Sequence, residues 1–116
     1  MTRLFIYGTL KRGECRAHHM LGQRYVGEAR TAPRYRMVHC GSYPGLVDVG
    51  EERGRAIEGE LWQVDAEGLK RLDIVEGTVE HLFERRAVAL ADHDGSVEAY
   101  YFAGEVRSLP DAGTCW

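Results

Sequence analysis

Hydrophobic and polar positions recur with a helical period over residues 66–76, which read Ala-Glu-Gly-Leu-Lys-Arg-Leu-Asp-Ile-Val-Glu. Each residue of a helix advances about 100° around the axis, so Leu69, Leu72 and Glu76 share one stripe. Asp65 precedes the segment and is a residue type that accepts hydrogen bonds from the first backbone N–H groups of a helix. The pattern predicts one amphipathic helix that carries an acid on its apolar side.

Glu76 is therefore the first candidate for chemistry. An acid on the apolar face of its own helix points towards the core or into a cleft. Desolvation and the negative end of the helix dipole both disfavour the carboxylate and raise the pKa of Glu76 towards the range of proton exchange near neutral pH. The alternative interpretation is a helix-end glutamate that turns out to water. The pattern alone leaves both open.

The other apolar positions predict short strands separated by turns. Alternation and short apolar runs favour strands at residues 4–7, 25–31, 35–39, 46–49, 55–64, 83–90 and 97–102. The last two are expected to form a hairpin through the polar segment 92–95, and residues 14–21 form either a short helix or an irregular connection. We expect an α+β fold, in which a small, curved, barrel-like sheet of mixed or antiparallel strands is accompanied by one main helix.

Size and charge narrow the class of protein. The 116 residues contain no linker or repeat, so we expect one domain over 1–116, with the role of residues 103–116 left open. A net charge of −3 and the absence of any long basic run argue against a nucleic-acid partner, and no apolar stretch is long enough to span a membrane. Three cysteines form no closed disulfide framework, so a cytoplasmic location is expected.

Histidine and cysteine residues do not predict a metal site. Cys15, His18 and His19, with His39 and Cys40 as further candidates, follow no standard zinc spacing, and adjacent histidines point in different directions. Nothing in the sequence marks one thiol as an activated nucleophile. We expect no metal and no cofactor.

The segment after the first predicted strand is a second candidate for function. Backbone N–H groups lose their sheet partners where a buried strand ends, and Gly8 lets a ligand approach the exposed backbone closely. The amides around Gly8, Thr9 and Leu10 could then hold an anion or a carbonyl oxygen. The alternative is an ordinary strand-to-turn transition. The glycine spacing of a phosphate loop is missing.

Four short segments, taken in order, resemble one family. They are Tyr-Gly-Thr-Leu-Lys at 7–11, Tyr-Pro-Gly at 43–45, Gly-Glu-Leu-Trp at 59–62 and Leu-Asp-Ile-Val-Glu-Gly at 72–77. Together they are similar to the γ-glutamylcyclotransferase-like superfamily, and more closely to its γ-glutamylamine cyclotransferase and AIG2-like branch. The resemblance runs from about residue 3 to residue 102. It implies a compact mixed barrel with a cavity beside the loop of the first strand.

The resemblance also implies roles for individual residues. Tyr7, Gly8, Thr9 and Leu10 would bind the γ-glutamyl group of a small-molecule substrate, largely through backbone amides. Glu76 would be the catalytic acid/base, the same residue that the helical pattern indicates. No cofactor is implied.

The chain departs from the family pattern at Phe83, where the family usually has a tyrosine. The simplest interpretation is that Phe83 packs in the core. Tyr43, Tyr100 or Tyr101 could supply a replacement hydroxyl, although strand alternation lets only one of the last two face the cavity. We include Tyr43 among the expected substrate-binding residues.

We therefore expect a cyclotransferase that releases 5-oxoproline and a free amine from a γ-glutamyl amide. The alternative, from another class, is a non-catalytic binding protein that keeps the fold and cavity for a small acidic ligand or a protein partner. A hydrolase that releases glutamate is a third possibility. The sequence identifies neither the leaving amine nor the oligomeric state.

Overall fold

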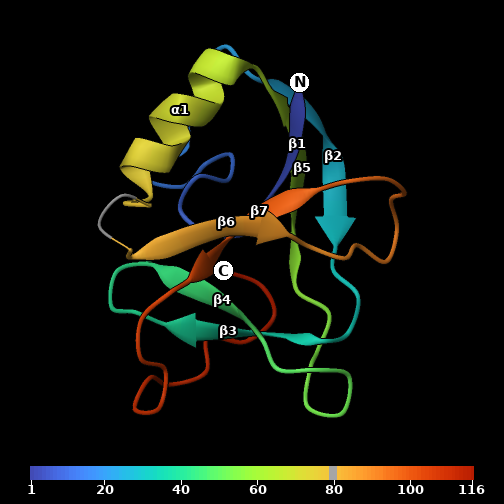
Figure 1. Cartoon of the computed structure of the whole chain (residues 1–116), viewed down its shortest axis with the longest axis vertical. Helices are drawn as coiled ribbons and strands as arrows, with labels where there is room; N and C mark the ends of the chain where they lie inside the picture. Colours follow the sequence, from blue (N-terminus) through green and yellow to red (C-terminus); the bar gives the residue numbers. More distant parts are fainter. Residues whose placement is uncertain (79–80) are drawn as a thin grey trace.

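The computed structural model describes residues 1–78 and 81–116 and has an α+β architecture (Figure 1). The main helix is α1 (Ala66–Val75), and a short 3-10 helix, η1, covers Ala17–Met20. The strands are β1 (Thr2–Ile6), β2 (Arg24–Arg30), β3 (Tyr35–His39), β4 (Pro44–Asp48), β5 (Glu58–Val64), β6 (Phe83–Ala87) and β7 (Glu98–Phe102). The predicted elements are thus all present, and the α+β class is confirmed.

Two of the predicted strands are shorter than expected. The segments 55–64 and 83–90 lose one end each, because Arg55 makes only a single bridge to Tyr35 and Leu90 a single bridge to Thr31. The segment 14–21, for which two interpretations were open, contains the single turn η1. No helix in the described parts of the chain has the length and apolar character needed to cross a membrane.

The strands form one mixed sheet in the order β2-β5-β1-β7-β4-β3, and β6 pairs with β7 outside this path. The β1–β7 and β4–β7 pairs are parallel, whereas β1–β5, β2–β5, β3–β4 and β6–β7 are antiparallel. The mixed sheet was predicted, but it is not a closed barrel, since β2 and β3 end the path without pairing to each other.

The sheet forks at β7 instead of closing. One edge of β7 pairs with β6 along its whole length, from Glu98 to Phe102. The other edge is divided between two strands, because Glu98 pairs with Leu4 of β1 and Tyr101 pairs with Leu46 of β4. β1 and β4 therefore lie beside different parts of β7.

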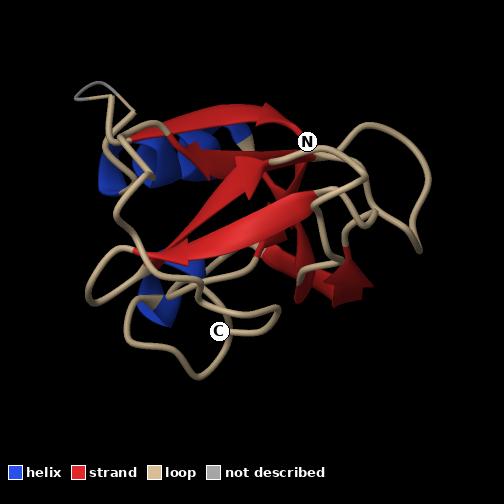
Figure 2. Ribbon diagram, turned by 90° about the horizontal axis from the view of Figure 1, so that it is seen from below, coloured by secondary structure: helices blue, strands red, loops and turns tan. Residues whose placement is uncertain are grey.

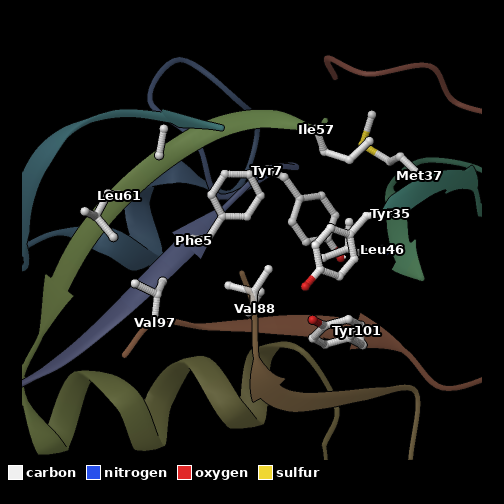
Figure 3. Packing of buried hydrophobic residues seen from close by; sticks show 12 residues of the cluster. Phe5, Tyr7, Tyr35, Met37, Leu46, Ile57, Leu61, Val88, Val97 and Tyr101 are labelled. Atoms are coloured by element: carbon white, nitrogen blue, oxygen red, sulfur yellow. Dashed lines mark hydrogen bonds between the residues drawn. The ribbon is translucent and has the colours of Figure 1, made fainter. Parts of the chain in front are cut away.

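Alternation along the strands divides the core into two clusters. On β1, Phe5 belongs with the first cluster, shown in Figure 3, while Leu4 and Ile6 belong with the second. On β7, Tyr101 points into the first cluster and Tyr100 into the second. The second cluster includes Leu72, so α1 packs against it. Both helical segments lie on the same side of the molecule in Figure 2.

Helix α1 begins and ends where the residue types predict. The Asp65 side chain accepts a hydrogen bond from the backbone N–H of Gly68 at 2.7 Å, as an N-cap does. The helix ends at Val75, and Gly77 follows with a positive φ of 70°, a backbone conformation that glycine adopts easily. The cap and the stop together fix the position of Glu76, the C-cap residue.

Replacing Leu72 with alanine tests the packing of α1. Leu72 is 0% exposed, so Leu72→Ala should lower the free energy of unfolding by about 2–5 kcal/mol through lost burial and a new cavity. Ile74→Ala is the matched control on the same helix, because Ile74 is 73% exposed and its loss should cost about 0.5 kcal/mol or less. Urea unfolding measures both. Equal losses of unfolding free energy in the two variants would contradict the packing of α1 through Leu72.

Candidate active site

The predicted site residues lie around one cavity. Its lining consists of Phe5, Ile6, Tyr7, Gly8, Thr9, Leu10, Arg16, Tyr43, Pro44, Glu76, Phe83 and Tyr100. This set contains every residue that the sequence pointed to as a site residue. The cavity lies at the carboxyl end of β1, between the loop that follows this strand, the end of α1 and the turn that precedes β4. The functional roles of these residues stay predictions.

The loop after β1 is held to the sheet by a buried acid. Glu60 of β5 accepts hydrogen bonds from the indole N–H of Trp62 at 3.1 Å and from the backbone N–H of Arg12 at 3.1 Å. Its second oxygen accepts from Nε of Arg12, also at 3.1 Å. The Arg12 guanidinium stacks on the Tyr25 ring, 3.6 Å from its centroid. Glu60 is 7% exposed, and these contacts satisfy its buried charge while fixing the loop.

Three residues of this loop, Gly8, Thr9 and Leu10, line the cavity. In the described part of the chain, the N–H groups of Gly8, Thr9 and Leu10 donate to no protein acceptor. Gly8 also lies so close to Pro44 that a Cβ there would meet the proline ring at 2.9 Å. A side chain at position 8 would therefore separate the loop from the turn before β4. The arrangement leaves three donors available for an anion or a carbonyl oxygen.

The Tyr7 hydroxyl joins β7 to β4 at the point where the sheet forks. Its hydroxyl donates to the Tyr100 carbonyl oxygen at 2.6 Å and accepts from the Leu46 N–H at 3.0 Å. These backbone groups lie on β7 and β4, next to the point where β1 leaves the sheet. Burial, followed by the nearby charge of Glu76, raises the pKa of Tyr7 well above its usual value. Tyr7 therefore shapes the cavity wall as a neutral hydroxyl that is already fully engaged.

Glu76 is a buried acid that faces the cavity. Its side chain keeps only 10% of its accessible surface, and no hydrogen bond to its carboxylate is present among residues 1–78 and 81–116. Desolvation raises the pKa of Glu76, and the positive charge of Arg16 partly offsets this effect. The nearest atoms of the two charged groups, Arg16 Nη2 and Glu76 Oε1, are 4.0 Å apart. The orientation expected from the helical pattern is thus the one observed.

Tyr100 supplies the tyrosine on β7 that faces the cavity. Its hydroxyl donates to Oδ1 of Asp73 at 2.6 Å, and Asp73 also binds Arg85 through both carboxylate oxygens. Burial and the hydrogen bond to Asp73 raise the pKa of Tyr100 far above its usual value. Tyr101 points away, with its hydroxyl on the Ala87 carbonyl. Only one of the two tyrosines lines the cavity, as alternation predicts.

Phe83 has a packing role, as expected from its aromatic side chain. It is buried, and its ring lies 5.8 Å from the rings of both Tyr43 and Phe102. Tyr43 is half-buried at the rim of the same cavity. Tyr43 is therefore a tyrosine placed beside Phe83 at the cavity, whereas the Tyr100 hydroxyl is engaged by Asp73.

The C-terminal segment does not cover the cavity. None of its residues is among the lining residues; instead, Trp116 packs against the first core cluster and lies 5.2 Å from the His39 ring, centroid to centroid. The segment is fastened to β5 through a hydrogen bond from the Glu58 N–H to the Thr114 carbonyl. Lys11 donates to the Trp116 carbonyl at 2.7 Å, so the segment supports the cavity loop from outside.

The histidines and cysteines do not gather into a ligand set. Within the described residues, no group of three or more His, Cys, Asp or Glu side chains is placed to hold a metal ion. The rings of His18 and His19 contact each other in a tilted arrangement, with centroids 4.1 Å apart.

Sequence reasoning did not identify Arg16 as a site residue. It lies in a turn-rich segment with no pattern, five residues after Lys11. The fold brings Arg16 beside the cavity loop, where its backbone N–H donates to the Thr9 carbonyl at 2.9 Å. The only available signal was its charge, and that signal is shared by many exposed arginines.

Fold and site together define a small α+β protein with a buried acid opposite an amide-lined loop. The family model described as "Gamma-glutamyl cyclotransferase, AIG2-like" matches residues 4–116. The chain belongs to this family.

Two curated relatives show the same likeness in sequence. A "Putative gamma-glutamylcyclotransferase" of Vibrio cholerae is 31% identical over 110 residues, which cover 95% of this chain and 91% of that protein. The gamma-glutamylaminecyclotransferase of Rattus norvegicus is 33% identical over 84 residues, which cover 66% of this chain and 56% of the rat protein.

Solved structures agree with the fold. An AIG2-like protein from Mus musculus superposes with a TM-score of 0.82 at 25% identity, over 98% of this chain and 87% of the mouse chain. A uropathogenic E. coli-specific protein superposes with a TM-score of 0.84, also at 25% identity, over 99% of this chain and 91% of that chain. The α+β fold is therefore that of the AIG2-like proteins.

Removing the buried acid of β5 should loosen the cavity loop. Glu60→Ala deletes the acceptor of both Arg12 and Trp62, so stability should fall by about 1–3 kcal/mol. Amide hydrogen exchange of residues 8–13 should accelerate more than exchange in β5. Glu58→Ala is the control, because Glu58 is exposed two residues earlier on the same strand. Unchanged exchange in Glu60→Ala would show that the loop is held by other contacts.

The raised pKa of Glu76 predicts a pH-dependent stability. The pKa of Glu76 in the folded protein is higher than its ordinary value of 4.5, which applies to the unfolded chain. The free energy of unfolding should therefore fall as the pH rises from about 4.5 through the folded pKa. Glu76→Gln does not titrate, so its stability relative to wild type should increase over the same range. Urea unfolding at a series of pH values measures this difference, and a constant difference would contradict the raised pKa.

Proposed function

We propose that this protein is a γ-glutamyl cyclotransferase, which converts a γ-glutamyl amide into 5-oxoproline and a free amine. The observation that carries the proposal is the Glu76 carboxyl, nine-tenths buried at a cavity that is also lined by Gly8, Thr9 and Leu10, whose N–H groups have no protein acceptor in the described chain. Membership of the cyclotransferase family supports the same reaction class.

The substrate brings its own nucleophile. In a γ-glutamyl amide, the α-amine can fold back onto the γ-carbonyl carbon of the same glutamyl group. Near neutral pH this amine is protonated and cannot attack. Glu76 takes a proton from it, which requires a carboxylate in the cavity. The raised pKa of Glu76 makes this carboxylate a better base than an exposed glutamate.

Ring closure transfers this proton and a second one from the α-nitrogen to the leaving nitrogen. The α-nitrogen forms a bond to the γ-carbonyl carbon, and a tetrahedral oxyanion develops at the former carbonyl oxygen. The protonated Glu76 gives its proton to the leaving nitrogen, and the bond between carbon and leaving nitrogen breaks. The Glu76 carboxylate then takes the second proton from the ring nitrogen, which keeps one hydrogen in 5-oxoproline, and passes it to the departing amine. Glu76 ends as a carboxylate, ready for the next cycle. The atoms balance without water entering the products.

The loop after β1 would hold the glutamyl end of the substrate. Amides of Gly8, Thr9 and Leu10 can bind the α-carboxylate, and one of them can donate to the developing oxyanion. The Glu60 and Arg12 contacts fix this loop before substrate arrives. An intramolecular reaction gains most from such orientation, because the folded-back conformer is the reactive one.

Glu76→Gln tests the proposed reaction. The amide keeps the shape of the side chain but neither accepts nor returns the proton, so 5-oxoproline release should fall by about 100-fold or more. The assay uses a panel of γ-glutamyl-amino acids and γ-glutamyl-ε-lysine, with both 5-oxoproline and free glutamate measured. Glu67→Gln is the control, since Glu67 is exposed in the first turn of the same helix.

Three other outcomes would reject the proposal. Undiminished release by Glu76→Gln would remove Glu76 from the chemistry. Glutamate in place of 5-oxoproline would indicate hydrolysis. No product from any substrate, together with thermal stabilisation of the wild type by the same compounds, would indicate a binding protein.

A further inference from the structure

Arg16 is the one cation among the described residues that line the cavity. All its other lining residues except Glu76 are uncharged at neutral pH. The cavity thus has two charged groups, an acid and a guanidinium, whose nearest atoms lie 4.0 Å apart. That separation is too long for a hydrogen bond, so neither group satisfies the other and both can bind polar atoms of a ligand.

Two hydrogen bonds hold Arg16 in place. Its backbone N–H donates to Thr9 of the loop at 2.9 Å, and its Nη2 donates to the Val75 carbonyl at the end of α1 at 2.8 Å. A guanidinium has five N–H donors in a planar fork, and Val75 accepts from one nitrogen only. The remaining donors fit a carboxylate, for which arginine is well shaped.

Arg16 is more accessible to solvent than Glu76 and the amide loop. Its side chain is 29% exposed, compared with 10% for Glu76, whereas Thr9 and Leu10 are 6% and 3% exposed as whole residues. The buried amides are placed to take the glutamyl end of a substrate. The leaving group, which differs between γ-glutamyl compounds, must then extend towards the solvent, on the side of Arg16.

We propose that Arg16 binds the carboxylate of the leaving group and so selects γ-glutamyl-α-amino acids over γ-glutamyl amines that lack this carboxylate. The proposal rests on the cyclotransferase function above. In an α-amino acid the carboxyl carbon lies about 2.5 Å from the nitrogen. A leaving nitrogen that receives its proton from Glu76 therefore brings this carboxylate within reach of Arg16. A lysine attached through its ε-nitrogen holds its carboxylate several carbons farther away.

The test compares two substrates that share the glutamyl group. The first is γ-glutamyl-alanine and the second is γ-glutamyl-ethylamide, whose leaving group differs mainly by the missing carboxylate. Wild type should prefer γ-glutamyl-alanine. Arg16→Gln should lower kcat/KM for γ-glutamyl-alanine by about 10- to 100-fold, mostly through KM, because a charge-assisted hydrogen bond is lost. Turnover of γ-glutamyl-ethylamide should fall less, because this substrate loses only the effect of the Arg16 charge on Glu76.

Two variants control for charge and position. Arg16→Lys keeps the positive charge but not the planar guanidinium with its five N–H donors. It should recover part of the preference for γ-glutamyl-alanine. Arg71→Gln removes an exposed charge from α1, outside the cavity lining, and should leave the preference unchanged. An equal loss for both substrates in Arg16→Gln would overturn the proposal, since Arg16 would then act on the glutamyl group or only cap α1. No change with either substrate would overturn it as well.

A binding measurement separates this proposal from the function on which it rests. Isothermal titration of Glu76→Gln with γ-glutamyl-alanine should give a Kd that rises about 10- to 100-fold when Arg16→Gln is added. Wild type that binds γ-glutamyl-alanine through Arg16 but turns over neither substrate would reject the cyclotransferase function and keep the role of Arg16. Turnover of both substrates without any dependence on Arg16 would reject only the role of Arg16.

Discussion

The hydroxyl of Tyr7 satisfies the backbone at the fork of the sheet, and the cavity depends on this contact. β7 shares one edge between β1 and β4, so a carbonyl on β7 and an N–H on β4 would lack strand partners where β1 leaves. The Tyr7 hydroxyl accepts from the Leu46 N–H and donates to the Tyr100 carbonyl, so both backbone groups have a partner. Because a single hydroxyl replaces strand pairing, β1 can turn away into a loop whose amides stay open. The space beside that loop is the cavity.

The two charged groups of the cavity are less fully satisfied than the other acid of the same helix. Glu76 is buried without a hydrogen-bond partner in the described chain, an arrangement that a purely structural residue would avoid. Arg16 offsets part of the desolvation without closing a tight ion pair. Asp73, three residues earlier on α1, is instead fully engaged by Arg85 and Tyr100. Two acids on one helix therefore have different environments, and only Glu76 is left to meet a ligand.

Much of the fold follows from local pattern. The period of 3.6 located α1, Asp65 marked its first turn, and alternation separated Tyr100 from Tyr101. The same local rules placed Glu76 on the apolar side of its helix but left open whether its carboxyl turns to water, and the family resemblance was needed to favour it as a site residue. Local pattern could not predict that the sheet stays open, because closure depends on which strand edges meet and not on the residues within one strand.

The sequence by itself determined the elements and the faces of those elements, and its resemblance to a family pointed to Tyr7 to Leu10 and Glu76. The elements and their faces depend on neighbours within a few residues, where the period of the backbone decides which side chains share a face. Only the tertiary structure decided that Arg16 joins the cavity, that Asp73 is tied to Arg85, and that the C-terminal segment supports the loop through Lys11. Each of these contacts joins residues from different elements. Their partners are set by how the strands and α1 pack, a property that no single segment of the chain encodes.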